Sequence, residues 1–299
     1  MTNLVSTPGQ SPTTARGVAD HRPRRRRRKV QPGLVIGLVF LLLVFGFLYA
    51  PLVATAVFSF NGTTVQTWPM QGLTLQWYRE LSTDDAMLAA LMFSIRVAVS
   101  AVIVSAVAGL VFALIMQRVH FAGKRILDAT LAIPLVAPGM VLGISLLVVF
   151  NFIDVPAGYV TLVAGHSAFI TPLMMFILQQ RLKTMDPSIE HASMDLGAGR
   201  LKTFWHVTLP GIRVSLFAAC LLGFTLSMDE IAMSFFLIGT EPTLPVYVWG
   251  LLRFGFTPEV NAIFTLIGAF SLTLIGGALA LLLASERRRK RQLASIGTN

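Results

Sequence analysis

The chain is organised as long apolar stretches separated by short polar segments. Six stretches cover about Leu34–Phe58, Met87–Met116, Ile126–Phe150, Val160–Gln179, Ile212–Ile238 and Val260–Ser285. A helix needs roughly 20 mostly apolar residues to cross about 30 Å of hydrocarbon, and each stretch meets that length. The longer ones must tilt or extend into the interface. The pattern therefore predicts an all-α, polytopic membrane protein with six transmembrane helices.

Composition supports the membrane class. Apolar residues make up 55% of the 299 residues and charged residues 13%, and the mean hydropathy is +0.72. A soluble chain of this length would carry far more charge. We expect one transmembrane domain over residues 32–286, a basic tail at 1–31 and a basic tail at 287–299. The first tail is expected to be disordered because it begins with a stretch rich in Ser, Thr, Pro and Gly.

The positive charges are distributed unevenly between the two sides of the predicted bundle. If the amino terminus is inside, all 24 Lys and Arg residues lie in inside segments except Arg79, Arg96 and Arg253. This bias predicts a multi-pass protein of the cell membrane with both termini in the cytoplasm. The basic run Arg22–Lys29 adjoins the first span, so we interpret it as an anchor that attracts membrane lipid and not nucleic acid.

The sequence shows no pattern of catalytic or metal-binding residues. It contains neither the phosphate-binding sequence Gly-x-x-x-x-Gly-Lys-[Ser/Thr] nor a Ser-centred nucleophile elbow. Its five histidines and single cysteine lack His-x-x-x-His or Cys-x-x-Cys spacing. We therefore expect no catalytic residue, no metal site and no cofactor on this chain. The function that remains is movement of a solute through the membrane.

A polar segment between the fourth and fifth spans is predicted to form a short helical knob. Pro187 suits the first turn of a helix, and Glu190 lies where the helix dipole favours negative charge. Gly197 or Gly199 can end the helix, since glycine accepts the left-handed conformation. Leu209-Pro210 then closes the segment.

The second half of this knob contains apolar side chains, among them Phe204 and Trp205, on what reads as an exposed loop. Exposed apolar side chains of this kind need a partner surface. A loop folded back onto its own helices is the alternative, but its Gly-to-Pro spacing favours docking to a partner.

The same segment resembles the EAA loop of ABC-importer permeases, whose signature is Glu-Ala-Ala, three residues, Gly, nine residues and Ile-any-Leu-Pro. His191 stands where that family has Glu, with Glu190 one residue early. Either His191 pairs with a different ATPase residue, or Glu190 reaches across. The resemblance implies the type I (MetI-like) permease fold, with ATP and Mg²⁺ bound by partner ATPase subunits. It assigns ATPase coupling to Glu190, His191, Ala192, Asp195, Gly197, Leu209 and Pro210.

Two adjacent carboxylates, Asp229 and Glu230, fall inside the fifth predicted span. Each costs roughly 3 kcal/mol by insertion scales and normally faces a cavity or a counter-charge. They either line a route for a cation, or one of them pairs with Arg96 of the second span. Both can hold, since neighbouring helical residues point about 100° apart. Pro134 and Pro138 permit a kink in the third span, which either gating or packing explains.

The stretch Gly223–Glu230 resembles the fifth span of the spermidine/putrescine permease family, PotC-type subunit. Leu244-Pro245 and Thr257–Ala262 extend the similarity. The resemblance implies a heterodimer with a second permease, two cytoplasmic ATPase subunits and an extracytoplasmic polyamine-binding protein. The sequence therefore predicts the permease of an ATP-driven polyamine importer. The alternatives are an ABC permease for another solute, a proton-coupled carrier that uses Asp229 or Glu230, and a membrane scaffold.

Overall fold

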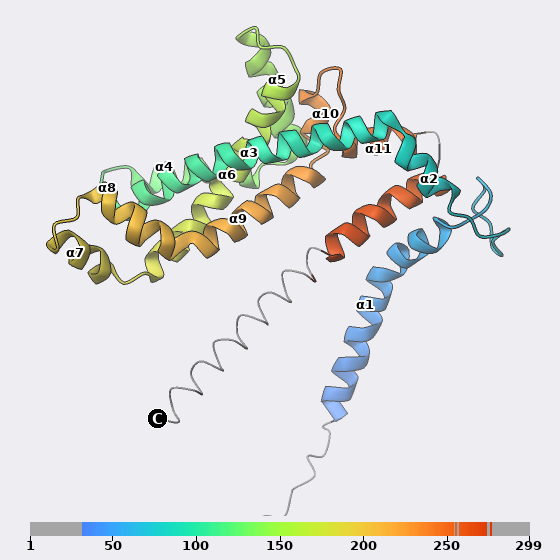
Figure 1. Ribbon diagram of the computed structural model, residues 1–299, viewed down its shortest axis with the longest axis horizontal. Coiled ribbons are helices and arrows are strands. Elements are labelled where there is room, and N and C mark those ends of the chain that lie inside the picture. The colour runs from blue at the N-terminus through green and yellow to red at the C-terminus, as the bar shows by residue number, and fades with distance from the viewer. Residues whose placement is uncertain (1–31, 254, 256, 274–275, 277–299) are drawn as a thin grey trace, which may run out of the picture. The chain divides into compact units, whose positions relative to one another are not determined.

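A computed structural model describes residues 32–253, 255, 257–273 and 276 (Figure 1). The tails expected at 1–31 and 287–299, and the end of the sixth predicted span, lie outside the described residues. The elements are α1 Pro32–Phe58, α2 Gln76–Thr83, α3 Asp85–Arg118, α4 Lys124–Val136, α5 Gly139–Phe152, α6 Tyr159–Thr184, α7 Pro187–Asp195, α8 Arg200–Thr203, a π-helical turn Phe204–Thr208, α9 Leu209–Asp229, α10 Ser234–Leu237 and α11 Leu244–Leu252. Residues 258–273 are also helical. This confirms the all-α class, because the described part contains no strand, only one isolated bridge between Asn61 and Leu73.

The chain divides into two compact units at Pro51 and Leu52. The first unit holds most of α1, whose apolar side chains are exposed along its length. Four described helices are long and apolar enough to cross a membrane: Ile36–Phe58, Asp85–Arg118, Tyr159–Thr184 and Arg200–Asp229. The α4–α5 pair is also apolar enough when taken together, as a broken span or a re-entrant loop.

The third predicted span, Ile126–Phe150, is wrong as one continuous helix. It consists of α4 and α5, which meet at a bend of 107°, and Figure 1 shows α5 turned away from the line of α4. Ala137 and Pro138 both adopt extended backbone, with ψ of 136° and 134°. The cause is Pro138, which lacks an N–H and disfavours helical backbone in the residue before it. Pro134 remains inside α4.

The centre of the second unit is formed by α3, α6 and α9, which pack side by side (Figure 1). Small residues allow the backbones to approach closely. A β-carbon on Gly109 of α3 would lie 2.8 Å from Cβ of Met174, and one on Gly223 of α9 would lie 2.8 Å from Cγ2 of Ile170. Both partners are on α6, so this helix is held between the other two by glycine contacts.

The fifth predicted span, Ile212–Ile238, is wrong at both ends. The helix begins at Arg200 and runs through the π-helical turn to Asp229. Leu209-Pro210 therefore lies inside it and does not close the preceding loop. Pro210 has no N–H to donate four residues back, and the N–H of Leu209 bonds the carbonyl of Phe204, five residues back. A widened turn beside a proline is a common way to relieve such a mismatch.

Two short helices, α2 and α11, lie in the segments that connect the longer ones. The first, α2, lies between α1 and α3. The second, α11, was not predicted as a helix and begins at Leu244-Pro245. Its first backbone N–H donates to Ser94 Oγ at 2.7 Å. Its side chains pack with α2, the start of α3 and helix 258–273, in a core of Leu81, Met87, Leu244, Val248, Val260, Ala262 and Ile263.

Candidate functional site

The first part of the predicted knob is α7, and the ends of this helix form as the sequence indicates. Asp186 caps the helix by accepting the N–H of Ser188 at 2.9 Å, and this bond lowers the pKa of Asp186. Pro187 occupies the first turn. Gly197 ends the element with a φ of 86°, and its N–H donates to Met194 O at 2.9 Å. The predicted start and the first of the two predicted stops are thus confirmed.

Glu190 fastens α7 to the bundle. Its Oε1 accepts from Nη2 of Arg118, the last residue of α3, at 2.5 Å. The same oxygen accepts from Thr208 Oγ1 at 2.6 Å, and Arg118 also donates to that hydroxyl at 3.1 Å. One carboxylate therefore joins α7, α3 and the π-helical turn. The sequence did not indicate Arg118 or Thr208, because they lie 72 and 18 residues away from Glu190 along the chain.

The other residues assigned to coupling are distributed around this node. His191, Ala192, Asp195 and Gly197 are exposed on α7 and the turn after it, whereas Leu209 is half-buried within the helix. Apolar side chains lie open nearby, on Leu196 (89% exposed), Leu201 (72%) and Trp205 (58%). Exposed apolar side chains in such a polar segment are suited to burial against another protein.

The two acids of the fifth span lie at the end of a helix and not in its middle. Asp229 is the last residue of α9 and is exposed. Glu230 leaves the helix with a ψ of 112°, and its Oε1 accepts the N–H of Met233 at 2.8 Å. That bond supports the turn that leads into α10.

A second helix break lies against the first. A β-carbon on Gly139, the first residue of α5, would be 3.1 Å from Glu230 Oε1. One on Gly143 would be 3.0 Å from the α-carbon of Met233. Interrupted helices with polar groups at the break are characteristic of substrate pathways in transporters. The arrangement places two carboxylates beside the break between α4 and α5, where they could attract a cation.

His166 of α6 forms hydrogen bonds on both sides of the break that contains Glu230. This residue was not identified from the sequence. Its ring is buried, with Nδ1 2.6 Å from Ser227 Oγ and Nε2 2.9 Å from Ser234 Oγ. The hydroxyl of Ser234 donates to the carbonyl of Glu230 at 2.8 Å. In a neutral ring Nε2–H therefore donates to Ser234, and Nδ1 accepts from Ser227. The histidine thus bridges the two sides of the break.

Arg96 does not pair with either acid of the break. Its Nη2 lies 3.8 Å from Glu241 Oε2, and its guanidinium carbon lies 5.6 Å from the ring centre of Phe93. The expected alternative, in which Arg96 neutralises Asp229 or Glu230, is therefore wrong. The sequence could not indicate Glu241, because this residue lies in the loop after α10 and only the fold brings it to α3.

The chain matches a family of transport proteins and several of its relatives. Residues 105–291 match the family described as "Binding-protein-dependent transport system inner membrane component". Putrescine transport system permease protein PotI of Escherichia coli (strain K12) is 37% identical over 268 residues, covering 86% of this chain and 94% of its own. Spermidine/putrescine transport system permease protein PotC of the same strain is 31% identical over 238 residues, covering 79% and 89%.

Two further matches show how widely the architecture is used. Sulfate transport system permease protein CysT of Salmonella typhimurium is 31% identical over 268 residues, covering 83% of this chain and 92% of its own. The crystal structure of a bacterial ABC transporter that imports the acidic polysaccharide alginate aligns with a TM-score of 0.64 at 17% identity, covering 84% of this chain and 98% of that chain. The second likeness shows a shared fold.

Proposed function

Because this chain belongs to the family of binding-protein-dependent transport system inner membrane components, we propose that it is the permease subunit of an ATP-driven polyamine importer. The observation that supports a cationic substrate is the pair of carboxylates, Asp229 and Glu230, at the end of α9 beside the break between α4 and α5. The relatives PotI and PotC are permeases of putrescine and spermidine/putrescine systems. Polyamines are flexible polycations, and carboxylates at Asp229 and Glu230 attract such a ligand strongly where water is scarce.

The charge of the junction separates this substrate from the anionic one of the sulfate relative. Asp229 is exposed, and Glu230 uses one carboxylate oxygen for the N–H of Met233, while its other oxygen has no hydrogen-bond partner among the described residues. Arg96, the one basic residue predicted within a span, is paired with Glu241. A pathway for an oxyanion would need the opposite arrangement, so the junction favours a cation.

Coupling to ATP hydrolysis is assigned to α7 and the turn that follows it. We expect a partner ATPase to bury Leu196, Leu201 and Trp205, while Glu190 carries the movement of α7 to α3 and α9. In this proposal the complex contains a second permease, two ATPase subunits that bind ATP and Mg²⁺, and an extracytoplasmic binding protein. Both termini and α7 face the cytoplasm, as the distribution of Lys and Arg indicates.

Uptake of labelled putrescine into vesicles that contain the assembled complex tests the substrate. D229N and E230Q together should reduce uptake at least tenfold while the complex still assembles. The matched control is E80Q on the exposed helix α2, which removes one carboxylate away from the junction and should leave uptake unchanged. Equal uptake by the double variant and the unmodified protein, or saturable uptake of sulfate, would refute the cation pathway.

Co-purification tests the docking surface. W205A should reduce the amount of ATPase recovered with the permease several-fold, because this side chain is an exposed aromatic anchor of the kind that dominates interfaces. F217A is the control, since Phe217 is also exposed (66%) but lies farther along α9 in the apolar span. If both variants retain the ATPase equally, the surface around Trp205 is not its docking site.

A further inference from the structure

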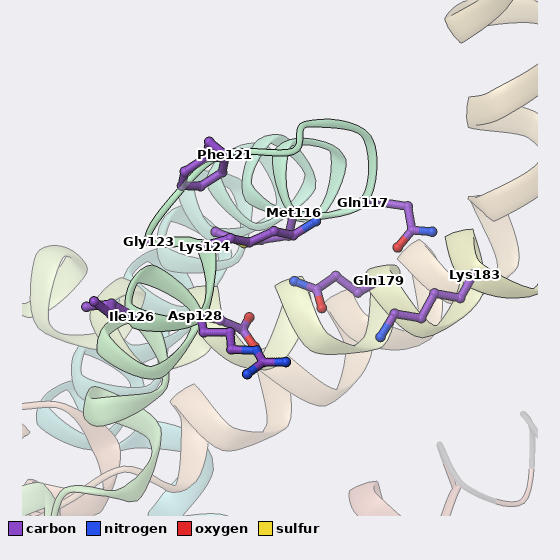
Figure 2. Close-up of a pocket in the computed structure, with 10 residues that line it drawn as sticks. Met116, Gln117, Phe121, Gly123, Lys124, Ile126, Asp128, Gln179 and Lys183 are labelled. Carbon is purple, nitrogen blue, oxygen red and sulfur yellow. The ribbon is translucent and has the colours of Figure 1, made fainter.

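A hollow of about 710 Å³ lies between the α3–α4 turn and the last turns of α6, at the end of the bundle that carries α7 (Figure 2). The transport proposal gives it no role. Its lining combines charged, amide and apolar side chains, contributed by Met116, Gln117, Phe121, Gly123, Lys124, Arg125, Ile126, Asp128, Gln179 and Lys183.

The hollow concentrates positive charge. Lys124 and Arg125 occupy the first turn of α4, which contains no acidic residue, and Lys183 approaches from the last turn of α6. Basic residues in the first turn of a helix are unfavourable because that end of the helix already carries partial positive charge. Gly123, with a φ of 90°, precedes the helix and provides no side-chain cap. Three cationic side chains and an uncapped helix start therefore converge where an anion would stabilise all of them.

Two polar atoms in the wall of the hollow lack hydrogen-bond partners. Gln179 is 6% exposed, yet its Nε2 bonds to nothing among the described residues, and the same is true of Asp128 Oδ1. Figure 2 shows these two side chains facing the same space from α6 and α4. A buried polar group without a partner costs free energy, so their exposure to one hollow indicates a ligand that both accepts and donates hydrogen bonds.

The rim of the hollow is apolar. Ile126 is 73% exposed and Phe121 is 38% exposed, and both also line the cavity. A small soluble anion would leave these apolar side chains exposed, whereas the acyl chains of a lipid would cover them. Basic pockets between spans at the cytoplasmic face are known sites for anionic headgroups.

We propose that this hollow binds one anionic phospholipid of the cytoplasmic leaflet through its headgroup. The phosphate lies among Lys124, Lys183 and the start of α4, and the amide of Gln179 donates to a headgroup oxygen. Asp128 Oδ1 accepts from a headgroup hydroxyl, which fits a polyhydroxyl headgroup such as phosphatidylglycerol. Lys124 Nζ donates one bond to Val119 O at 3.2 Å and keeps two protons for the lipid. The assignment rests on the proposed function only in placing this end of the bundle at the cytoplasmic leaflet.

Native mass spectrometry of the full-length chain, purified with the subunits that accompany it, measures the lipid directly. Phosphatidylglycerol should be retained at least tenfold better than phosphatidylcholine with the same acyl chains. K124Q/K183Q should weaken retention about fivefold per lysine, on the order of 25-fold together. R200Q/R213Q is the matched control, because it removes two exposed positive charges at the same end of the bundle without touching the hollow. Equal retention of the two lipids, or equal losses in the two double variants, would overturn the proposal.

Two further measurements test whether the bound anion is a lipid or soluble phosphate, and whether Gln179 contacts it. Inorganic phosphate at a concentration equal to that of the lipid should leave phosphatidylglycerol bound; displacement would show a site for a soluble anion instead. Q179M should reduce retention several-fold without lowering the midpoint of thermal unfolding in lipid-free detergent, because it removes an unpartnered amide. Unchanged retention would refute the role of Gln179. Retention requires neither ATP nor putrescine, so a negative result here leaves the import proposal standing, and a failure of import leaves this measurement intact.

Discussion

Gly139 and Glu230 meet where two interrupted helices touch: a β-carbon on Gly139 would lie 3.1 Å from Oε1 of the glutamate. Gly139 starts α5 after the bend at Pro138, and Glu230 follows the last residue of α9. The two residues are far apart in sequence, yet each borders a helix break: Gly139 is the first residue after one, and Glu230 is the first residue of the other. A movement of α5 against α10 would therefore change the surroundings of this carboxylate directly.

Replacing a glycine at this junction by alanine should lower the free energy of unfolding by an amount that depends on the atoms the new methyl group would contact. G143A should lower the free energy of unfolding by about 1–3 kcal/mol, because its β-carbon would lie 3.0 Å from backbone of Met233, which cannot easily move. G139A should cost less, since the atoms its β-carbon would meet belong to side chains and not to backbone. Thermal unfolding in detergent measures both. G250A on α11 is the control, with nothing within 4 Å, and a loss there as large as that of G143A would contradict the explanation.

His166 should contribute to stability through both ring nitrogens. H166L removes two bonds between helices and leaves Ser227 and Ser234 without this partner, so we expect a loss of about 1–3 kcal/mol. Chemical unfolding in detergent provides the measurement. S105A serves for comparison, because Ser105 is equally buried but makes one long bond of 3.4 Å to Ser167 O. The bridge would be unimportant if the two variants were equally stable.

Glu190 and His191 should behave differently although they are neighbours. E190Q breaks the charge pair with Arg118, and a double-mutant cycle with R118Q should give a coupling of about 0.5–1 kcal/mol, modest because both side chains are partly exposed. H191Q, at an exposed position, should leave the free energy of unfolding unchanged within about 0.5 kcal/mol. If instead H191Q destabilised the protein as much as E190Q, the histidine and not the glutamate would hold α7.

The phenol of Tyr247 should lose its proton at an unusually high pH. Burial, its 2.7 Å hydrogen bond to Asp84 Oδ2 and the negative charge of Asp84 raise the pKa of Tyr247 to about 12. The fold thus favours the neutral phenol, so this contribution to stability is complete below the unfolded pKa of about 10 and is lost as the pH rises through about 12. The ultraviolet absorbance of tyrosinate follows the titration, and Y247F should remove its latest component. A late component that persists in Y247F would belong to another tyrosine.

The hydrogen bond between Tyr247 and Asp84 should also affect stability at low pH, through the carboxylate of Asp84. Burial acts to raise the pKa of Asp84, but the bonds from Tyr247 and from the backbone N–H groups of Met87 and Ala86 outweigh it, and the net pKa is lowered. Asp84 therefore contributes stability that is present above its unfolded pKa, about 3.8, and is lost as the pH falls through the lower folded value. D84N should flatten this acid dependence in a pH series of thermal unfolding.

Local chemistry explains why some elements were predictable. Asp186 and Gly197 act on their own neighbours, one through a hydrogen bond two residues away and the other through its backbone angle. Such signals need no knowledge of the fold. The break at Pro138 was visible only as a permitted kink, because hydropathy does not distinguish one long span from two short helices at 107°.

The helical membrane class, the approximate apolar stretches and the ends of α7 could be read from the sequence, since each depends on composition or on neighbours within a few residues. Tertiary structure alone decided which partners the charged residues take: Arg118 for Glu190, Glu241 for Arg96 and Gly139 against Glu230. The physical reason is that an ion pair or a close contact forms between groups that packing brings together, and sequence separation says nothing about that distance.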